Sequence, residues 1–438
     1  MTLVHIKTYG CAHNMSDSEV MAQYLVKEGY QVSGFGRLAI EQDLSEPELI
    51  ETADLVIYNT CTVKNPSEDK FFSQLHATNK PVIIAGCIPQ AEARAEWLVQ
   101  YSAIGVEQLH RVADVVEQTL QGVVVHELKK QKSLHKRDFV PTLRKNKYVA
   151  IIPILQGCLG ACTYCKTKFA RGTLKSYPLD DIIAQIRLAK HDGIHEMWLV
   201  SEDNGAYGLD IDLTLLDLLR AIQSIEGDFK IRLGMFNPEY AYEYRHELPE
   251  IIKDDRFYDF IHIPIQAGNN QVLEDMVRPY TREQFQEAVD LFKEKIPSIS
   301  IATDIICGFP TESDDQWKET MDLVKKNTFS VINISKFYPR GGTSAAKMKL
   351  LPTEIPKARS KELSEWFAGQ NYNESYVGTT VKVFFSEEGK NDTLIGKTQN
   401  YKQVVIVGNK DLLGKYALVT ITHTTRDDLR GHLALVNS

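Results

Sequence analysis

Three closely spaced cysteines constrain this chain more than any other feature of its sequence. Cys158, Cys162 and Cys165 lie in one short segment that follows the apolar stretch Val149 to Leu155. Three thiolates at this spacing can bind three irons of a [4Fe–4S] cluster and leave the fourth iron open to another ligand. A structural zinc site usually needs four ligands, and no fourth cysteine or suitably spaced histidine lies nearby. The spacing therefore favours an iron–sulfur site over zinc.

The sequence around this motif alternates apolar strand patterns with amphipathic helix patterns. Such alternation predicts an α/β fold, and six strand units in series favour a complete or partial (βα) barrel. Active sites of these barrels form at the C-terminal ends of the strands, which is where the three cysteines lie. The expected strands span residues 149–155, 196–200, 230–235, 260–265, 299–306 and 331–337.

A second set of cysteines lies in the N-terminal part, where shorter strand and helix patterns predict a parallel sheet. Cys11, Cys61 and Cys87 each follow a predicted strand. Because the ends of parallel strands meet at one edge of a sheet, we expect these thiols to converge and form a second cluster site. A single buried cysteine is more often a small core residue, and Cys307, which has no partner, is assigned to that class.

Signals for helix starts lie near these three thiols. Ser16 and Glu19 have the spacing of a capping box, while Pro66 and Pro89 are typical of a first helical turn. Helix N-termini beside the thiols are expected to lower the thiol pKa and to favour an anionic cluster.

Composition changes toward the end of the chain. Residues 373–438 contain short β-rich runs separated by glycines, which predicts a small antiparallel β-barrel.

A basic linker precedes the central domain: residues 128–147 contain eight lysines and arginines and one acidic residue. The expected domains are therefore residues 1–127, 148–372 and 373–438. Since the net charge is −8, any RNA contact must come from local patches.

The cysteine count also bears on the compartment. Seven cysteines, an odd number, in a chain without an apparent signal peptide or long apolar run favour metal ligation or catalysis over disulfides. We expect a cytoplasmic protein that does not enter a membrane.

With both cysteine sets, the chain resembles the methylthiotransferase family of radical-SAM enzymes along essentially its whole length. Residues 158–165 are similar to the radical-SAM signature, with an aromatic residue before the last cysteine. Residues 165–172 and 201–208 resemble the archaeal and eukaryotic branch, which acts on N6-threonylcarbamoyladenosine at position 37 of tRNA. Further matching stretches are residues 8–11, 59–63, 86–90, 262–268, 303–310 and 338–343.

The resemblance implies cofactors and a reaction. It implies two [4Fe–4S] clusters, S-adenosylmethionine (SAM), and a C-terminal RNA-binding domain called TRAM. One SAM is expected to methylate a sulfur attached to the N-terminal cluster, and a second to yield the radical that leads to a 2-methylthio product. The expected partners are the anticodon stem-loop of tRNA and an electron donor such as flavodoxin or ferredoxin.

The resemblance also directs attention to polar residues near the predicted barrel strands. Positions on or just after these strands suit contact with SAM; they are Tyr164, Ser201, Glu202, Arg232, Asn237 and Gln266. Lys166, Lys168 and Arg171 lie beside the first cysteine set and are expected to meet substrate phosphates or the threonyl carboxylate. Lysines with interleaved tyrosines, among them Tyr401 and Tyr416, favour RNA contact by the C-terminal barrel.

Two other functions are consistent with the same cysteines. One is methylthiolation of a ribosomal-protein aspartate, which would give the clusters a protein substrate. The other is a non-catalytic iron–sulfur protein that binds RNA or transfers electrons. With labelled SAM, label in protein instead of RNA would indicate the ribosomal-protein substrate. A protein that holds clusters but does not cleave SAM reductively would be the non-catalytic one.

Overall fold

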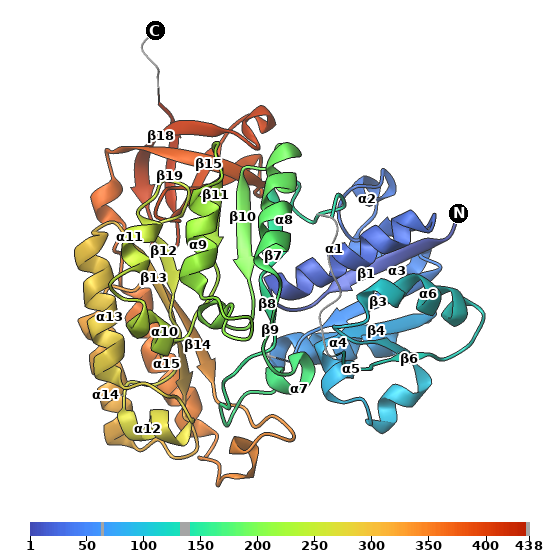
Figure 1. Ribbon diagram of the computed structural model, residues 1–438, viewed down its shortest axis with the longest axis horizontal. Helices are drawn as coiled ribbons and strands as arrows, with labels where there is room; N and C mark the ends of the chain where they lie inside the picture. Colours follow the sequence, from blue (N-terminus) through green and yellow to red (C-terminus); the bar gives the residue numbers. More distant parts are fainter. Residues whose placement is uncertain (63–64, 132–140, 435–438) are drawn as a thin grey trace.

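The computed structural model describes residues 1–62, 65–131 and 141–434 (Figure 1). Part of the predicted basic linker, residues 132–140, lies outside the described residues. No helix in the described ranges is long and apolar enough to cross a membrane.

The N-terminal domain is built on a sheet of six strands, and the predicted parallel arrangement is confirmed. Along the sheet the order is β2-β1-β3-β4-β5-β6. The strands are β1 (Leu3–Thr8), β2 (Gln31–Ser33), β3 (Leu55–Thr60), β4 (Val82–Gly86), β5 (Ser102–Ile104) and β6 (His126–Glu127). The helices are α1 (Ala12–Lys27), α2 (Ile40–Asp43), α3 (Glu46–Thr52), α4 (Asn65–Ala77), α5 (Cys87–Ala91) and α6 (Val112–Leu120).

The central domain is an open parallel barrel. All six segments expected to form strands do so, in two three-stranded sheets of order β11-β10-β7 and β12-β13-β14, which a bridge between Ile231 and Phe257 brings together. The strands are β7 (Val149–Pro153), β10 (Glu196–Val200), β11 (Lys230–Leu233), β12 (Phe260–His262), β13 (Ser300–Cys307) and β14 (Val331–Lys336), and a short antiparallel pair, β8 (Leu155–Gln156) and β9 (Lys175–Ser176), flanks the cysteine loop.

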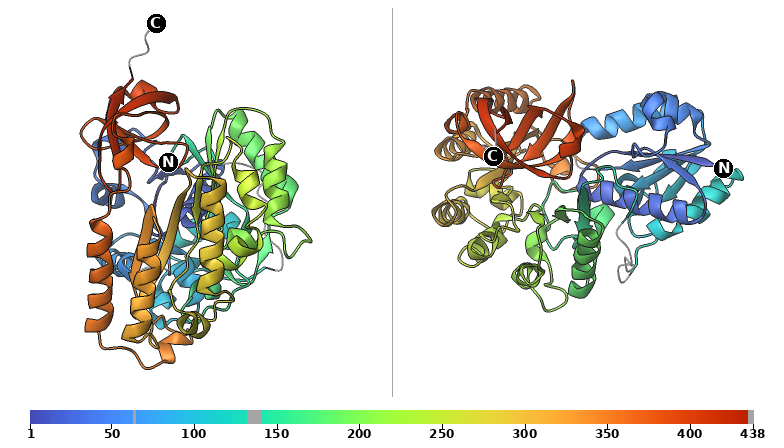
Figure 2. Two further views of the ribbon diagram at one scale, coloured as in Figure 1. Left: turned by 90° about the vertical axis from the view of Figure 1, so that its left-hand side faces the viewer. Right: turned by 90° about the horizontal axis from the view of Figure 1, so that it is seen from above.

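Helices cover the outer face of these strands (Figure 2). Their buried faces carry apolar residues at helical spacing, as in α9, where Leu215, Leu219 and Ile222 are buried. The helices are α7 (Thr167–Arg171), α8 (Leu179–His191), α9 (Leu215–Gln223), α10 (Pro238–Glu243), α11 (Leu248–Ile252), α12 (Asn270–Asp275), α13 (Arg282–Lys295), α14 (Asp314–Lys326) and α15 (Glu354–Ala368).

A closed five-stranded barrel forms the C-terminal domain. Its strand order is β15-β16-β17-β19-β18, and the pairings are antiparallel except for the parallel pair β17 and β19. The strands are β15 (Thr380–Glu388), β16 (Thr393–Lys397), β17 (Gln403–Val407), β18 (Tyr416–Thr424) and β19 (Leu429–Leu433).

One turn of this small barrel packs against the N-terminal ends of the central strands. The Gln399 side chain donates to the carbonyl of Phe257 at 2.8 Å, and its carbonyl accepts from Asp259 at 2.9 Å, just before β12. Asn400 donates to the carbonyl of Ser298, before β13, at 3.1 Å. The C-terminal barrel therefore closes the end of the central barrel opposite to the cysteine loop (Figure 1).

Lys402 lies in this interface, and burial lowers its pKa to about 8. The folded protein holds this proton less strongly than the unfolded chain, so wild-type stability rises as the pH increases from about 8 to the ordinary lysine value of 10.5. We expect Lys402→Met to raise the free energy of unfolding by about 1 kcal/mol at pH 7, with the gain disappearing above pH 10. Urea unfolding at both pH values tests this, with the exposed Lys390→Met as control. An equal effect at both pH values would contradict it.

Candidate iron–sulfur sites

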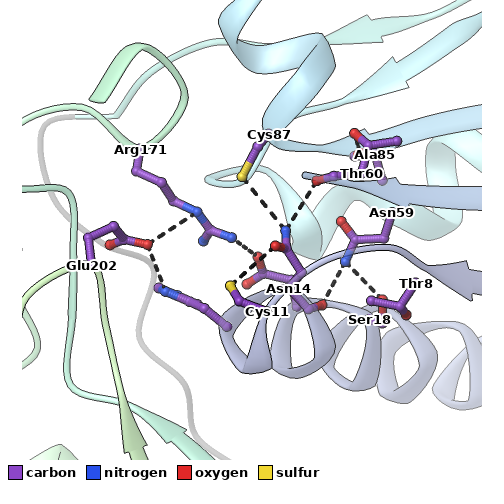
Figure 3. Close-up of polar contacts among 12 residues, drawn as sticks. Thr8, Cys11, Asn14, Ser18, Asn59, Thr60, Ala85, Cys87, Arg171 and Glu202 are labelled. Atoms are coloured by element: carbon purple, nitrogen blue, oxygen red, sulfur yellow. Dashed lines mark hydrogen bonds and ion pairs between the residues drawn. The ribbon is translucent and has the colours of Figure 1, made fainter. Parts of the chain in front are cut away.

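The three N-terminal cysteines lie together at the C-terminal edge of the parallel sheet. Cys11 follows β1, Cys61 follows β3 and Cys87 follows β4 directly. Asn14 lies between two of the thiols: its Oδ1 is 3.4 Å from the Cys11 sulfur, and its Nδ2 is 3.7 Å from the Cys87 sulfur (Figure 3). A Cβ placed on Gly10 would lie 3.1 Å from the Cys61 sulfur. We call Cys11, Cys61 and Cys87 the auxiliary triad.

Helix starts surround the auxiliary triad, and Pro66 of α4 and Pro89 of α5 lie in first helical turns, as the sequence predicted. Helix α1 begins at Ala12 with Cys11 as its N-cap residue, and α5 begins at Cys87. The predicted capping box at Ser16 and Glu19 is wrong, because both residues are buried inside α1. Glu19 instead accepts a hydrogen bond from the backbone of Lys145 at 3.0 Å, which ties α1 to the end of the linker.

The expected lowering of the thiol pKa does not hold at Cys87. Burial raises the pKa of this thiol, and the positive charge of Arg171 is the largest opposing influence. The effect of burial exceeds that of the helix start and the nearby cation. Metal binding at this residue must therefore displace a proton.

Gly10 is required for the auxiliary triad to form. Its φ of +126° is unfavourable for other residues, and an added Cβ would lie 2.6 Å from Cys61 Cβ and 2.6 Å from Asn14 Oδ1. We expect Gly10→Ala to remove about half of the iron bound after anaerobic reconstitution. Gly29→Ala is the matched control, because Gly29 also has a positive φ, +84°, but nothing within 4 Å of the added carbon. Normal iron content in Gly10→Ala would disprove the requirement.

The second cysteine set lies on the loop between β8 and α7. The loop folds around Gly160, whose added Cβ would lie 3.4 Å from the Cys158 sulfur and 3.7 Å from the Cys162 sulfur. The Gly160 amide donates to the Cys158 sulfur at 3.2 Å. Burial raises the pKa of Cys158 to about 12. We call Cys158, Cys162 and Cys165 the loop triad.

Each triad offers three free thiols as possible metal ligands. In the ranges that the structure describes, no three His, Cys, Asp or Glu side chains form a group that could hold one ion. Ligands of a polynuclear cluster bind different irons and lie farther apart than ligands of one zinc ion. The donor sets, three thiols each, fit two [4Fe–4S] clusters with one iron of each left without a cysteine.

A polar network extends from the loop triad into the barrel. Arg278 donates from Nη1 to the Cys162 sulfur at 2.9 Å and from Nη2 to Asn237 Oδ1 at 2.5 Å. Asn237 in turn donates to Asp203 at 2.6 Å, and burial raises the pKa of Asp203 to about 7. Asn237 was predicted from the sequence, whereas Arg278 and Asp203 were not, because no spacing pattern marks them.

Other predicted SAM contacts occupy the same end of the barrel. Ser201 follows β10 and hydrogen-bonds to Asn204. Gln266 has a φ of +74° and joins its backbone to Asp304 and Ile306. Tyr164 packs partly buried against the barrel core. These three remain predicted cofactor contacts.

Arg232 is placed differently from the expectation. Its guanidinium lies 5.5 Å from the ring of Trp198, 5.4 Å from Phe260 and 5.6 Å from Tyr401. Since Tyr401 belongs to the C-terminal barrel, Arg232 faces that interface and does not serve a cofactor at the loop triad. Tyr401 is correspondingly unavailable for RNA stacking, because it packs on Tyr258 and Phe260.

Glu202 and Arg171 meet between the N-terminal and central domains. Arg171, 1% exposed, lies 2.6 Å from Asp17 and 3.5 Å from Glu202. Glu202 also lies 2.9 Å from His13 Nδ1 and accepts from the Gly157 amide at 2.8 Å. Neither side chain has the predicted position: Arg171 is too buried for substrate phosphates, and Glu202 contacts the neighbouring domain.

The two remaining cations of the loop also have protein partners. Lys166 forms an ion pair with Glu92 of the N-terminal domain. Lys168 donates to the carbonyl of Gly160 at 2.8 Å and to that of Leu159 at 3.1 Å. Both residues thus hold the loop triad, and their contact with substrate stays a prediction.

Comparison with known families places each of the three domains. Residues 152–324 match the Radical SAM superfamily, residues 3–103 match the family described as Uncharacterized protein family UPF0004, and residues 374–434 match the TRAM domain. These matches define a radical SAM protein with an added N-terminal and a C-terminal domain.

Proteins with similar sequences identify the family within the radical SAM superfamily. The chain is 41% identical to a threonylcarbamoyladenosine tRNA methylthiotransferase of Drosophila melanogaster, covering 98% of this chain and 77% of the relative. A human protein of the same name is 40% identical (98% and 73%), and a probable one from Pyrococcus abyssi is 36% identical (99% and 100%). The chain belongs to the threonylcarbamoyladenosine tRNA methylthiotransferase family.

Solved structures support the fold. A radical S-adenosylmethionine methyltransferase, TsrM from Kitasatospora setae, solved with cobalamin and a [4Fe–4S] cluster, has a TM-score of 0.54 and 15% identity over 85% of this chain and 76% of that chain.

Proposed function

We propose that this chain is a tRNA methylthiotransferase that converts N6-threonylcarbamoyladenosine at position 37 of tRNA, beside the anticodon, to its 2-methylthio derivative. The observation that carries the proposal is the pair of cysteine triads, one on each side of an interface joined by Arg171 and Glu202. The names of the relatives, which cover nearly the whole chain, supply the substrate.

The residues of each triad would hold one [4Fe–4S] cluster, and SAM would bind at the open iron of the loop triad. When bound, the clusters and SAM supply the sulfur, the methyl group and the radical. The chain's own part is orientation. Arg278 fixes Cys162 and Asn237, while Ser201, Gln266 and Tyr164 present polar groups around the same barrel end.

Buried side chains also exclude water from this space. Asp203 and Asn237 are buried within the barrel end, and Arg171 and His13 are buried at the interface. A reactive radical needs such protection, because water and solvent-borne groups would otherwise intercept it.

An electron donor of the flavodoxin or ferredoxin kind is part of the proposal. Leu159, between Cys158 and Cys162, is exposed, which gives a partner an apolar contact near the cluster ligands. We also propose a cytoplasmic location, because reduced thiols and the tRNA substrate are both available there.

The C-terminal barrel has exposed lysines that suit a tRNA backbone. Lys382, Lys390 and Lys415 are exposed, whereas Lys397 and Lys402 are partly buried. We expect replacing the three exposed lysines by methionine to weaken tRNA binding and flatten its salt dependence by about one to two units of the log–log slope. Deletion of the whole C-terminal barrel is a poorer test, because it would also remove the turn at Gln399 and expose the end of the central barrel that this turn covers.

The matched control for this binding experiment replaces three exposed lysines on the central helices, Lys253, Lys318 and Lys361. Binding is measured at several salt concentrations with an unmodified anticodon stem-loop. If the control variant lost as much affinity as the first, the C-terminal barrel would not be the RNA-binding surface.

Mass spectrometry of tRNA nucleosides from cells lacking this protein tests the proposed function. We expect the 2-methylthio derivative to disappear and its unmodified precursor to accumulate. A parallel reaction with SAM labelled in the methyl group follows the label into RNA or protein. Label in a ribosomal protein would replace the proposal, and absence of reductive SAM cleavage would leave a non-catalytic iron–sulfur protein.

A further inference from the structure

Two buried nitrogen atoms near the auxiliary triad have no hydrogen-bond partner among the described residues. They are Arg171 Nη1 and His13 Nε2. Arg171 is 1% exposed and His13 is 2% exposed. Leaving a buried polar group unpaired costs free energy, and more so on a charged group, so such atoms call for a ligand.

The guanidinium of Arg171 is fixed beside the triad. Asp17 holds Nη2 at 2.6 Å, and Glu202 lies 3.5 Å from Nε, which leaves Nη1 as the nitrogen without a partner. Figure 3 shows the guanidinium between Glu202 and the helix that carries Cys11 and Asn14. Its positive charge acts on both Cys11 and Cys87.

An apolar wall adjoins the same place. Cys87 packs in a small cluster with Val106 and Ala170, both buried, and Ala91 lies against it. Ala170 precedes Arg171, so charge and apolar surface come from adjacent residues of α7. A small anion with one methyl group would meet the cation on one side and this wall on the other.

We propose that Arg171, supported by His13, forms a subsite for a small sulfur anion, hydrosulfide or methanethiolate, at the iron that the auxiliary triad leaves without a cysteine. The inference rests on the proposed function, which requires sulfur at this place, and adds the residues that hold it. Arg171 is a positioning residue: it donates a charge-assisted hydrogen bond to the anion and orients it toward the central barrel.

Glu202 extends this arrangement to the loop triad. Its carboxylate contacts Arg171 and His13 on one side and the Gly157 amide, directly before Cys158, on the other. One buried carboxylate thereby fixes the position of the anion subsite relative to the second cluster site.

The test measures anion affinity without tRNA or turnover. In the full-length chain carrying Cys158→Ala, Cys162→Ala and Cys165→Ala, only the auxiliary cluster remains after reconstitution. Hydrosulfide and methanethiolate are titrated separately, and binding is followed by the electron paramagnetic resonance spectrum of the reduced cluster. The two titrations distinguish the sulfur species that the subsite accepts.

The informative variant is Arg171→Met combined with Asp17→Asn, because removing the cation alone would leave a buried carboxylate uncompensated. We expect Kd for the anions to rise about tenfold or more. Lys175→Met is the control: it breaks another pair between the same domains, Lys175 with Glu107 at 2.9 Å, without touching the triad, and should leave Kd unchanged. Arg171→Lys, which keeps the charge, should give an intermediate Kd.

An unchanged Kd in the double variant with normal iron content would overturn the proposal, as would failure of both anions to bind the parent. If the double variant loses its iron, the Arg171→Lys variant provides the test instead. A Kd for Arg171→Lys equal to that of the parent would then overturn the proposal. Failure of the proposed function is seen separately, as wild-type protein that modifies no tRNA. The anion titration does not depend on that result.

Discussion

Replacing Cys158, Cys162 and Cys165 together by alanine is expected to abolish release of 5′-deoxyadenosine from SAM and to remove about half of the bound iron. The three residues share one loop between β8 and α7, so their loss leaves that site without a thiolate. The auxiliary triad lies on a different sheet and should keep its iron. Iron is assayed after anaerobic reconstitution, and deoxyadenosine is measured by chromatography after addition of a reductant.

Cys307→Ala provides the control for this triple variant. Cys307 is fully buried in the core of the central barrel, at the end of β13. Its replacement should cost about 1 kcal/mol of stability through a small cavity and leave iron and deoxyadenosine release unchanged. Full iron content in the triple variant would show that the loop triad is not a cluster site.

The strands and the convergence of the auxiliary triad could be predicted from the sequence for the same reason. Apolar runs separated by amphipathic helices leave few arrangements other than parallel strands. Parallel strands in turn bring their C-terminal ends to one edge, so cysteines distant in sequence become neighbours. Cys11 and Cys87 both contact Asn14 although 76 positions separate them.

Side-chain partners between domains could not be predicted in this way. Arg171 and Asp17 are 154 positions apart, and no periodicity links them. A strand position such as that of Arg232 indicates a place along the barrel but not which end the side chain serves. The RNA-contact prediction for the C-terminal barrel is wrong at Tyr401 for a related reason, because docking of the turn at Gln399 partly buries Tyr401 and Lys402. The amino-acid composition of a segment does not indicate which of its side chains another domain will cover.

Cys87→Ala is expected to separate reductive SAM cleavage from methylthiolation of tRNA. SAM cleavage should stay within about twofold of the wild-type rate, because the loop triad keeps all its ligands and distant sites act independently. Methylthiolation of tRNA should fall by more than about 100-fold, since the auxiliary cluster loses a thiolate ligand and the sulfur its binding place. Deoxyadenosine release and the 2-methylthio nucleoside are measured in the same reaction.

The physical basis for this separation is the position of Cys87. It lies at the end of β4, contacts Asn14 and packs on Ala170 of α7, the helix that follows the loop triad. Ala91→Ser, in the same helix α5, places a small polar group near Cys87 without removing a thiol and serves as the control. If Cys87→Ala lost SAM cleavage while its loop cluster was intact by electron paramagnetic resonance, the two triads would have to act as one unit. Arg171 and Glu202 would then transmit the coupling, because they join the sites through buried charges.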